Sequence, residues 1–92
     1  MEHLDLVLDT SRQGISLGIY RSGVPLDEFF EPETRGENLG QALDRSLERA
    51  CVSLGDIRRV LVALGPGSFT GLRTGIAFCE GLCFSGRRSL FG

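Results

Sequence analysis

The chain has 92 residues, of which 41% are hydrophobic and 24% charged, and its formal net charge is −2. This length suits one small domain and excludes a second core, and the composition is that of an ordinary folded protein and excludes a disordered one. The negative net charge disfavours independent binding to nucleic-acid backbones, which a basic surface would favour.

The N-terminus and the cysteines bear on where the protein works. The start, Met1 to Asp5, is too polar for a secretory signal, and no apolar stretch approaches the ~20 residues of a membrane span. Cys51, Cys79 and Cys83 lack the C-x-x-C spacing of a zinc or redox site. We therefore expect a cytoplasmic protein that holds no metal or cofactor and makes no membrane contact.

The first third of the chain predicts three strands. Residues 4–9 form a β-rich run, residues 15–20 alternate apolar and other side chains, and residues 24–31 form a less regular run. Short glycine-containing turns separate these runs. Two tight turns between consecutive strands predict an antiparallel meander.

The apolar period changes after Glu37. From Leu39 to Leu54 apolar side chains recur every three or four residues, which predicts an amphipathic helix of about 16 residues, capped by Asn38 and ending near Gly55. Residues 59–64 are almost continuously apolar, as in a strand covered on both faces. A second helix is expected from Thr70 to about Phe84, and residues 87–91 begin another strand.

A glycine-rich segment, residues 65–73 (GPGSFTGLR), joins the second predicted helix to the strand before it. Ser68 or Thr70 is the expected N-cap, and the free amides of a helix start attract anions, with Arg73 one turn away. The segment is neither a P-loop nor a dinucleotide fingerprint, because Thr70 stands where both patterns require glycine. A structural strand-to-helix turn and an anion site both remain open.

Gly75 and Gly81 lie inside the second predicted helix. A glycine in a helix interior costs about 0.5–1 kcal/mol relative to alanine. Close approach of another backbone would offset that cost. Packing on the chain's own sheet and contact with a partner chain are equally consistent with the pattern.

The predicted order is βββαβα followed by the start of a further strand. It implies an α/β fold with a mixed sheet and matches a ribonuclease-H-like lobe of the actin-like ATPases. In that fold the turn after the first strand faces phosphate. Asp9 and Thr10 occupy that turn and, with Ser68 and Thr70, form the candidate site for an alternative function, nucleotide or phosphate binding. Otherwise Asp9 and Thr10 cap their own turn.

Three segments resemble the TsaB (YeaZ) family. They are Leu8-Asp9-Thr10-Ser11 after the first strand, Arg35 before the first helix, and GPGSFTGLRTG at 65–75. Members of this family are bacterial accessory proteins in the synthesis of N6-threonylcarbamoyladenosine in tRNA. The resemblance implies an actin-like (ASKHA) fold. Because family members are longer, it also implies that residues 1–92 form a single N-terminal lobe, with the C-terminal lobe absent from this chain.

The resemblance further implies an accessory subunit without a catalytic site. Such a subunit binds and activates the catalytic subunit TsaD, is joined by the ATPase TsaE, forms a homodimer when alone, and meets tRNA only through the complex. Carried over by position, the partner interface draws on both helices: Leu39, Leu43, Leu47, Phe69, Leu72, Arg73, Gly75, Ile76 and Cys79. The family usually has R-x-H-S where this chain has Arg35-Gly36-Glu37-Asn38, so the role of Glu37 in place of histidine is open.

The rival interpretation is an enzyme, since older naming of the wider family points to a glycoprotease-type metallopeptidase. Metal-assisted hydrolysis needs several histidine or carboxylate ligands around one ion. His3 is the only histidine in the sequence. We therefore expect no enzymatic activity.

Overall fold

The computed structural model describes residues 3–10, 14–32, 38–63, 69–86 and 88–92, with the backbone alone for residues 69–72. The elements follow in the order β1 (Leu4–Asp9), β2 (Ile15–Arg21), β3 (Val24–Glu31), α1 (Leu39–Ala50), the 3-10 turn η2 (Leu54–Asp56), β4 (Ile57–Val62), α2 (Phe69–Gly86) and β5 (Ser89–Phe91). The order expected from the sequence is confirmed.

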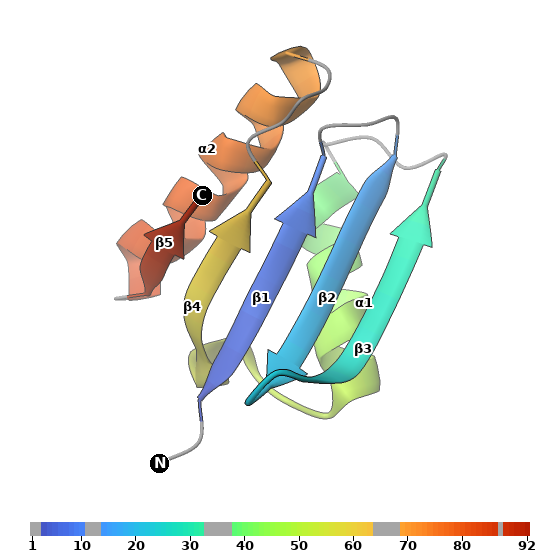
Figure 1. Cartoon of the computed structure of the whole chain (residues 1–92), viewed down its shortest axis with the longest axis vertical. Helices are drawn as coiled ribbons and strands as arrows, with labels where there is room; N and C mark the ends of the chain where they lie inside the picture. Colours follow the sequence, from blue (N-terminus) through green and yellow to red (C-terminus); the bar gives the residue numbers. More distant parts are fainter. Residues whose placement is uncertain (1–2, 11–13, 33–37, 64–68, 87) are drawn as a thin grey trace.

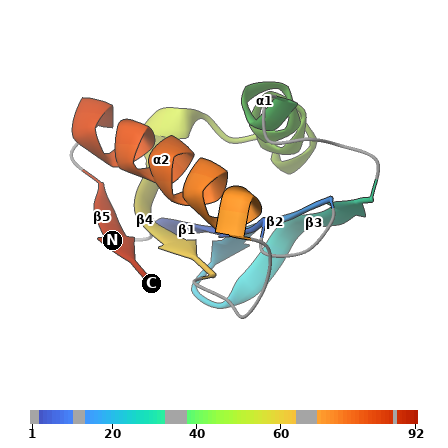
Figure 2. The ribbon, with the colours of Figure 1, turned by 90° about the horizontal axis from the view of Figure 1, so that it is seen from above.

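The strands form one mixed sheet in the order β3-β2-β1-β4-β5. β1, β2 and β3 pair antiparallel, as the predicted meander requires, whereas β4 pairs parallel to β1 and to β5. Both helices lie on the same face of this sheet (Figure 2). Figure 1 looks onto the opposite face, which we call the uncovered face because neither α1 nor α2 packs on it.

The core lies between the sheet and the two helices. Leu4, Leu6 and Leu8 alternate along β1 and are at most 3% exposed, while the residues between them are only half-buried on the uncovered face. The leucines of α1 pack against Leu4, Leu6 and Leu8 on the face of the sheet that the helices cover. Alternation along the strand and a three-to-four-residue step along the helix thus converge on one core.

Helix α1 is shorter than expected and ends at Ala50 instead of near Gly55. Cys51 adopts the left-handed conformation, with φ 58°, and reverses the chain there. The amides of Cys51 and Val52 donate 3.1 Å hydrogen bonds to the carbonyls of Glu48 and Leu47. This is a Schellman closure. Asn38 does occupy the N-cap position, but its side chain makes no capping hydrogen bond.

Strand β4 departs from the prediction in its bounds and in its cover. It begins at Ile57 and ends at Val62, and the expectation that both its faces are covered is wrong. Arg59 is exposed and pairs with Asp5 of β1 through two hydrogen bonds of 2.7 and 2.8 Å. The apolar run did not reveal that one face of β4 lacks a helix. Leu61 lies on that face and is nevertheless apolar, like the residues that face the helices.

Polar contacts fasten α1 to the edge strand β3. Arg45 reaches Glu31 at 3.0 Å, and Arg49 reaches Asp27 at 2.9 Å. The Arg49 guanidinium also lies 4.7 Å from the centre of the Phe29 ring. α1 is therefore held by charges at its rim and by leucines beneath.

As far as the described residues go, neither helix has the length and apolar character needed to cross a bilayer.

Candidate functional site

Helix α2 presents an exposed surface that we call the outer face of α2. Four of its members follow one another at steps of three or four residues, and the fifth, Gly81, lies four residues after Ala77 and three before Phe84, which places all of them on one side of a helix. Phe84 is 96% exposed, the most exposed large apolar side chain among the described residues. The members of the face are Arg73, Ala77, Glu80, Gly81 and Phe84.

The two helix-interior glycines differ in their surroundings. A Cβ added at Gly75 would collide with the hydroxyl oxygen of Thr10, which follows β1. Gly75 is therefore explained by close packing on the chain's own sheet. A Cβ at Gly81 would meet nothing within 4 Å. The described residues thus supply no contact that accounts for Gly81.

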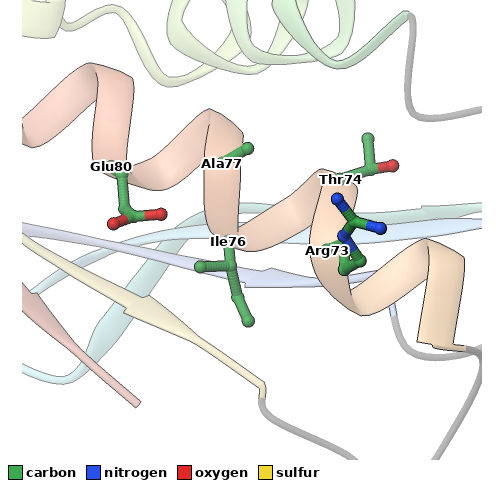
Figure 3. Close-up of a pocket in the computed structure, with 5 residues that line it drawn as sticks. All are labelled: Arg73, Thr74, Ile76, Ala77 and Glu80. Carbon is green, nitrogen blue, oxygen red and sulfur yellow. The ribbon is translucent and has the colours of Figure 1, made fainter.

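An open hollow of about 680 Å³ lies along α2 and is lined by Arg73, Thr74, Ile76, Ala77 and Glu80 (Figure 3). Ile76 points toward the sheet, whereas Thr74 and Ala77 lie on the other side of the helix (Figure 3). Ile76 packs against the core and is only partly exposed. The hollow therefore has a floor of small or partly buried side chains and charged groups at its ends.

The α1 residues of the expected interface lie inside the chain's own core. Leu39, Leu43 and Leu47 are 1%, 3% and 9% exposed. Their side chains therefore face the core and not the surface. A partner-facing stripe and a core-facing stripe have the same periodicity, so the sequence could not distinguish them. The outward side of α1 carries Asp44, Arg45, Glu48 and Arg49 instead. It is a charged surface.

The α2 residues of the expected interface separate into two groups. Arg73 is exposed and Ile76 is partly exposed, but Gly75 and Cys79 are buried. Burial, and secondarily the neighbouring Cys83, raises the pKa of Cys79 to about 12, so its thiol stays protonated. The side chains of Phe69 and Leu72 lie outside the described residues. The sequence reasoning missed Ala77, Glu80 and Phe84, which share a helix face with Gly81.

Of the four residues of the nucleotide alternative, the structure describes the side chains of Asp9 and Thr10. Asp9 lines a hollow of about 230 Å³ with Gly14, Ser16 and Phe30. Thr10 is 4% exposed and packs against Gly75. Ser68 and the side chain of Thr70 lie outside the described residues, as do Arg35 and Glu37. Nucleotide binding therefore stays a prediction.

Metal chemistry would require clustered ligands. Over the ranges that the structure describes, no three histidine, cysteine, aspartate or glutamate side chains lie close enough to hold an ion together. His3, on which the peptidase interpretation depends, is exposed.

Comparison with known proteins places this geometry in a family. Residues 33–92 match the family described as TsaD, tRNA N6-adenosine threonylcarbamoyltransferase. The chain is 29% identical over 89 residues to the tRNA threonylcarbamoyladenosine biosynthesis protein TsaB of Escherichia coli K12, covering 95% of this chain and 38% of that protein. It is 31% identical over 94 residues to TsaB of Buchnera aphidicola subsp. Schizaphis graminum, covering 100% of this chain and 44% of that protein.

A solved structure gives the same result. YeaZ from Pseudomonas aeruginosa superposes with a TM-score of 0.88 at 28% identity, over 97% of this chain and 42% of that one. The expected ribonuclease-H-like fold is thereby confirmed. The chain spans about two fifths of the length of these relatives.

Proposed function

The chain belongs to the family of TsaD and TsaB proteins, and from that premise we propose that it is a non-catalytic partner subunit in the synthesis of N6-threonylcarbamoyladenosine in tRNA. In this proposal it binds and activates a TsaD-type catalytic subunit, and a TsaE-type ATPase joins the assembly. The protein works in the cytoplasm and meets tRNA through the complex. The binding surface is the outer face of α2.

The observation that carries the proposal is the open space over Gly81. An exposed glycine destabilises the helix of an isolated chain, since alanine would cost nothing sterically and favour the helix. A partner backbone lying against Gly81 would account for it. Phe84, one turn further on the same face, is a large aromatic side chain of the kind that anchors interfaces.

Similarity to the catalytic subunit supports a particular geometry. The family matched by residues 33–92 is that of the transferase, so α1, β4 and α2 have counterparts in the proposed partner. Two related subunits pair readily about a two-fold or pseudo-two-fold axis, with equivalent helices in contact. In a homodimer of this kind, antiparallel α2 helices crossing near Ala77 would bring Arg73 of each copy opposite Glu80 of the other.

The test is a binding measurement with a purified TsaD-type subunit. We expect the 92-residue chain to form a complex on size-exclusion chromatography with light scattering, and Gly81→Ala to weaken it by roughly tenfold or more, as when a close backbone contact is lost. Phe84→Ala should weaken it similarly.

Gly40→Ala is the matched control. Gly40 is also an exposed helix glycine with nothing within 4 Å of an added Cβ, but it lies on α1. The proposal fails if the chain neither self-associates nor binds the catalytic subunit under conditions in which a longer TsaB relative does. It fails also if Gly81→Ala and Gly40→Ala bind alike.

A further inference from the structure

Helix α2 is held against the rest of the chain at two places, one in each half of the helix. In the second half Cys79 is fully buried, and Arg88 donates a 2.9 Å hydrogen bond to the carbonyl of Leu82. In the first half Gly75 packs against Thr10, the residue that follows β1. Gly75 and Leu82 are separated by about 10 Å along the helix axis, so the two supports together set the tilt of α2 over the sheet.

The contact between Gly75 and Thr10 is close. A Cβ at Gly75 would collide with Thr10 Oγ1, although it would lie at ordinary contact distances of 3.4 and 3.5 Å from Thr10 Cβ and Cγ2. The helix backbone therefore lies nearer to the Thr10 hydroxyl than any residue with a side chain would allow. The neighbouring Ile76 also packs on the core but is only partly buried, so Thr10 is the closer support of this half.

Thr10 cannot easily turn aside. It is 4% exposed, so its side chain is surrounded by other atoms. Of its two other staggered rotamers, one places the methyl group where the hydroxyl now lies, and the other moves the methyl group to a position that now holds only a hydrogen. Both rotamers would displace packed neighbours. The Thr10 side chain thus limits how closely the first half of α2 approaches the sheet.

The outer face of α2 draws on both halves of the helix. Arg73 and Ala77 belong to the first half, and Gly81 and Phe84 to the second. Ala77 and Phe84 are about 10 Å apart along the axis. A partner that contacts both residues at once must find them at a fixed relative height. A change in the tilt of α2 would alter that height.

We infer that Thr10 is a positioning residue for the outer face of α2, although it lies on the sheet side of the helix. Thr10 acts through Gly75, because its hydroxyl sets the distance between the sheet and the first half of α2. The inference rests on the proposed function for what binds the outer face, whereas the tilt of α2 is a property of the chain alone. An added methyl group at Gly75 should raise the first half while Arg88 holds the second.

The tilt is measured on the ¹⁵N-labelled chain alone by residual dipolar couplings, which report the direction of the α2 amides relative to those of the sheet. We expect Gly75→Ala to turn the helix axis by about 5°, for a shift on the order of 1 Å between supports about 10 Å apart. Thr10→Ala in the same chain removes the hydroxyl and should restore the axis. An axis that does not turn in Gly75→Ala, or that stays turned in the double variant, would overturn the inference.

The consequence for binding is measured by calorimetric titration with a purified TsaD-type subunit. Gly75→Ala should weaken binding by roughly threefold to thirtyfold, as for a substitution that acts without touching the ligand. Thr10→Ala, which adds no clash, should also weaken it, because it removes the support under the helix. The double variant should bind more tightly than either single variant, since the new methyl group fills part of the space that the hydroxyl leaves.

Ile19→Val is the matched control, because it also removes packing from the core but lies in β2, which packs against α1. It should leave the affinity unchanged. Loss of folded chain alone does not explain a larger effect, since a variant that stays about nine-tenths folded loses only about a tenth of its apparent affinity. Equal affinities of Gly75→Ala and the unaltered chain would overturn the inference and leave the proposed function standing. An unaltered chain that binds no partner would overturn both.

Discussion

The hydroxyl of Ser46 donates a 2.7 Å hydrogen bond to Asp27, joining the buried side of α1 to the edge strand β3. Ser46 is fully buried and Asp27 nearly so, with 12% of its side chain exposed. The hydroxyl of a serine on the apolar face of a helix thereby has a hydrogen-bond acceptor, and the same carboxylate also accepts hydrogen bonds from Arg49.

Asp27 should make folding sensitive to acid. Hydrogen bonds from Arg49 above all, and also from Ser46, hold the pKa of Asp27 below its ordinary value. A carboxyl whose pKa is lowered by folding stabilises the native state above its unfolded pKa of about 3.9. That stability is lost as the pH falls through the lowered folded pKa. Asp27→Asn should therefore cost about 1–2 kcal/mol at neutral pH and reduce the loss of stability below about pH 4.

Urea unfolding between pH 7 and pH 3 measures this dependence. Glu31→Gln is the control, because Glu31 also pairs with an arginine of α1 but is more exposed, at 32%. An exposed ion pair contributes about 0.2–1 kcal/mol. If both variants lose the same stability at pH 7, Asp27 has no special part in holding α1.

The two glycines of α2 should respond to alanine with opposite signs in the isolated chain. Gly81→Ala should raise the free energy of unfolding by about 0.5–1 kcal/mol, because the added methyl group meets open space. Gly75→Ala should lower it by about 1–3 kcal/mol, because the methyl group would collide with Thr10.

A double-mutant cycle isolates the cause of the Gly75 effect. Thr10→Ala removes the colliding hydroxyl and should restore part of the stability that Gly75→Ala loses. Additive losses in the double variant would show that the Gly75 position is constrained by something other than Thr10. Denaturant unfolding of the four proteins in the cycle gives both quantities.

A substitution at the end of α1 should stabilise the folded chain. Cys51 holds a left-handed conformation with φ 58°, which costs a non-glycine residue roughly 1–2 kcal/mol. Cys51→Gly should therefore stabilise the chain by about 0.5–1 kcal/mol, after allowance for the greater freedom of glycine in the unfolded chain. Cys51→Ala keeps the strain and should give no gain. A gain with alanine as large as that with glycine would mean that the thiol, and not the backbone conformation, is responsible.

We expect Arg88 to contribute to the free energy of unfolding through hydrogen bonds to two backbone carbonyls. Its Nη1 donates to the Leu82 carbonyl at 2.9 Å and its Nη2 to the Leu54 carbonyl at 2.8 Å, tying the end of α2 to the turn η2. Lysine has no planar fork to reach two carbonyls at once. Arg88→Lys should thus lose about 1–2 kcal/mol, nearly as much as Arg88→Met. Full stability in Arg88→Lys, measured by thermal and urea unfolding, would contradict this role.

Much of the fold could be predicted because its signals are local. Alternation from Ile15 to Ile19 marks β2, and the leucine spacing from Leu39 to Leu47 marks α1. The end of α1 could not be predicted, because a cysteine closes it where glycine is the usual residue. The same leucine spacing could not tell whether this stripe faces the chain's own core or a partner, since periodicity reveals an apolar stripe without revealing what packs against it.

The sequence by itself determined the order of the elements, the family string at 65–75 and the presence of unusual glycines inside a helix, because each is a property of neighbouring residues. Only the tertiary structure decided that Thr10 occupies the space beside Gly75 while the space beside Gly81 is open, and that both helices lie on one face of the sheet. The reason is physical: packing partners such as Gly75 and Thr10 are distant in sequence, and a residue's contacts depend on the crossing of elements that no local pattern encodes.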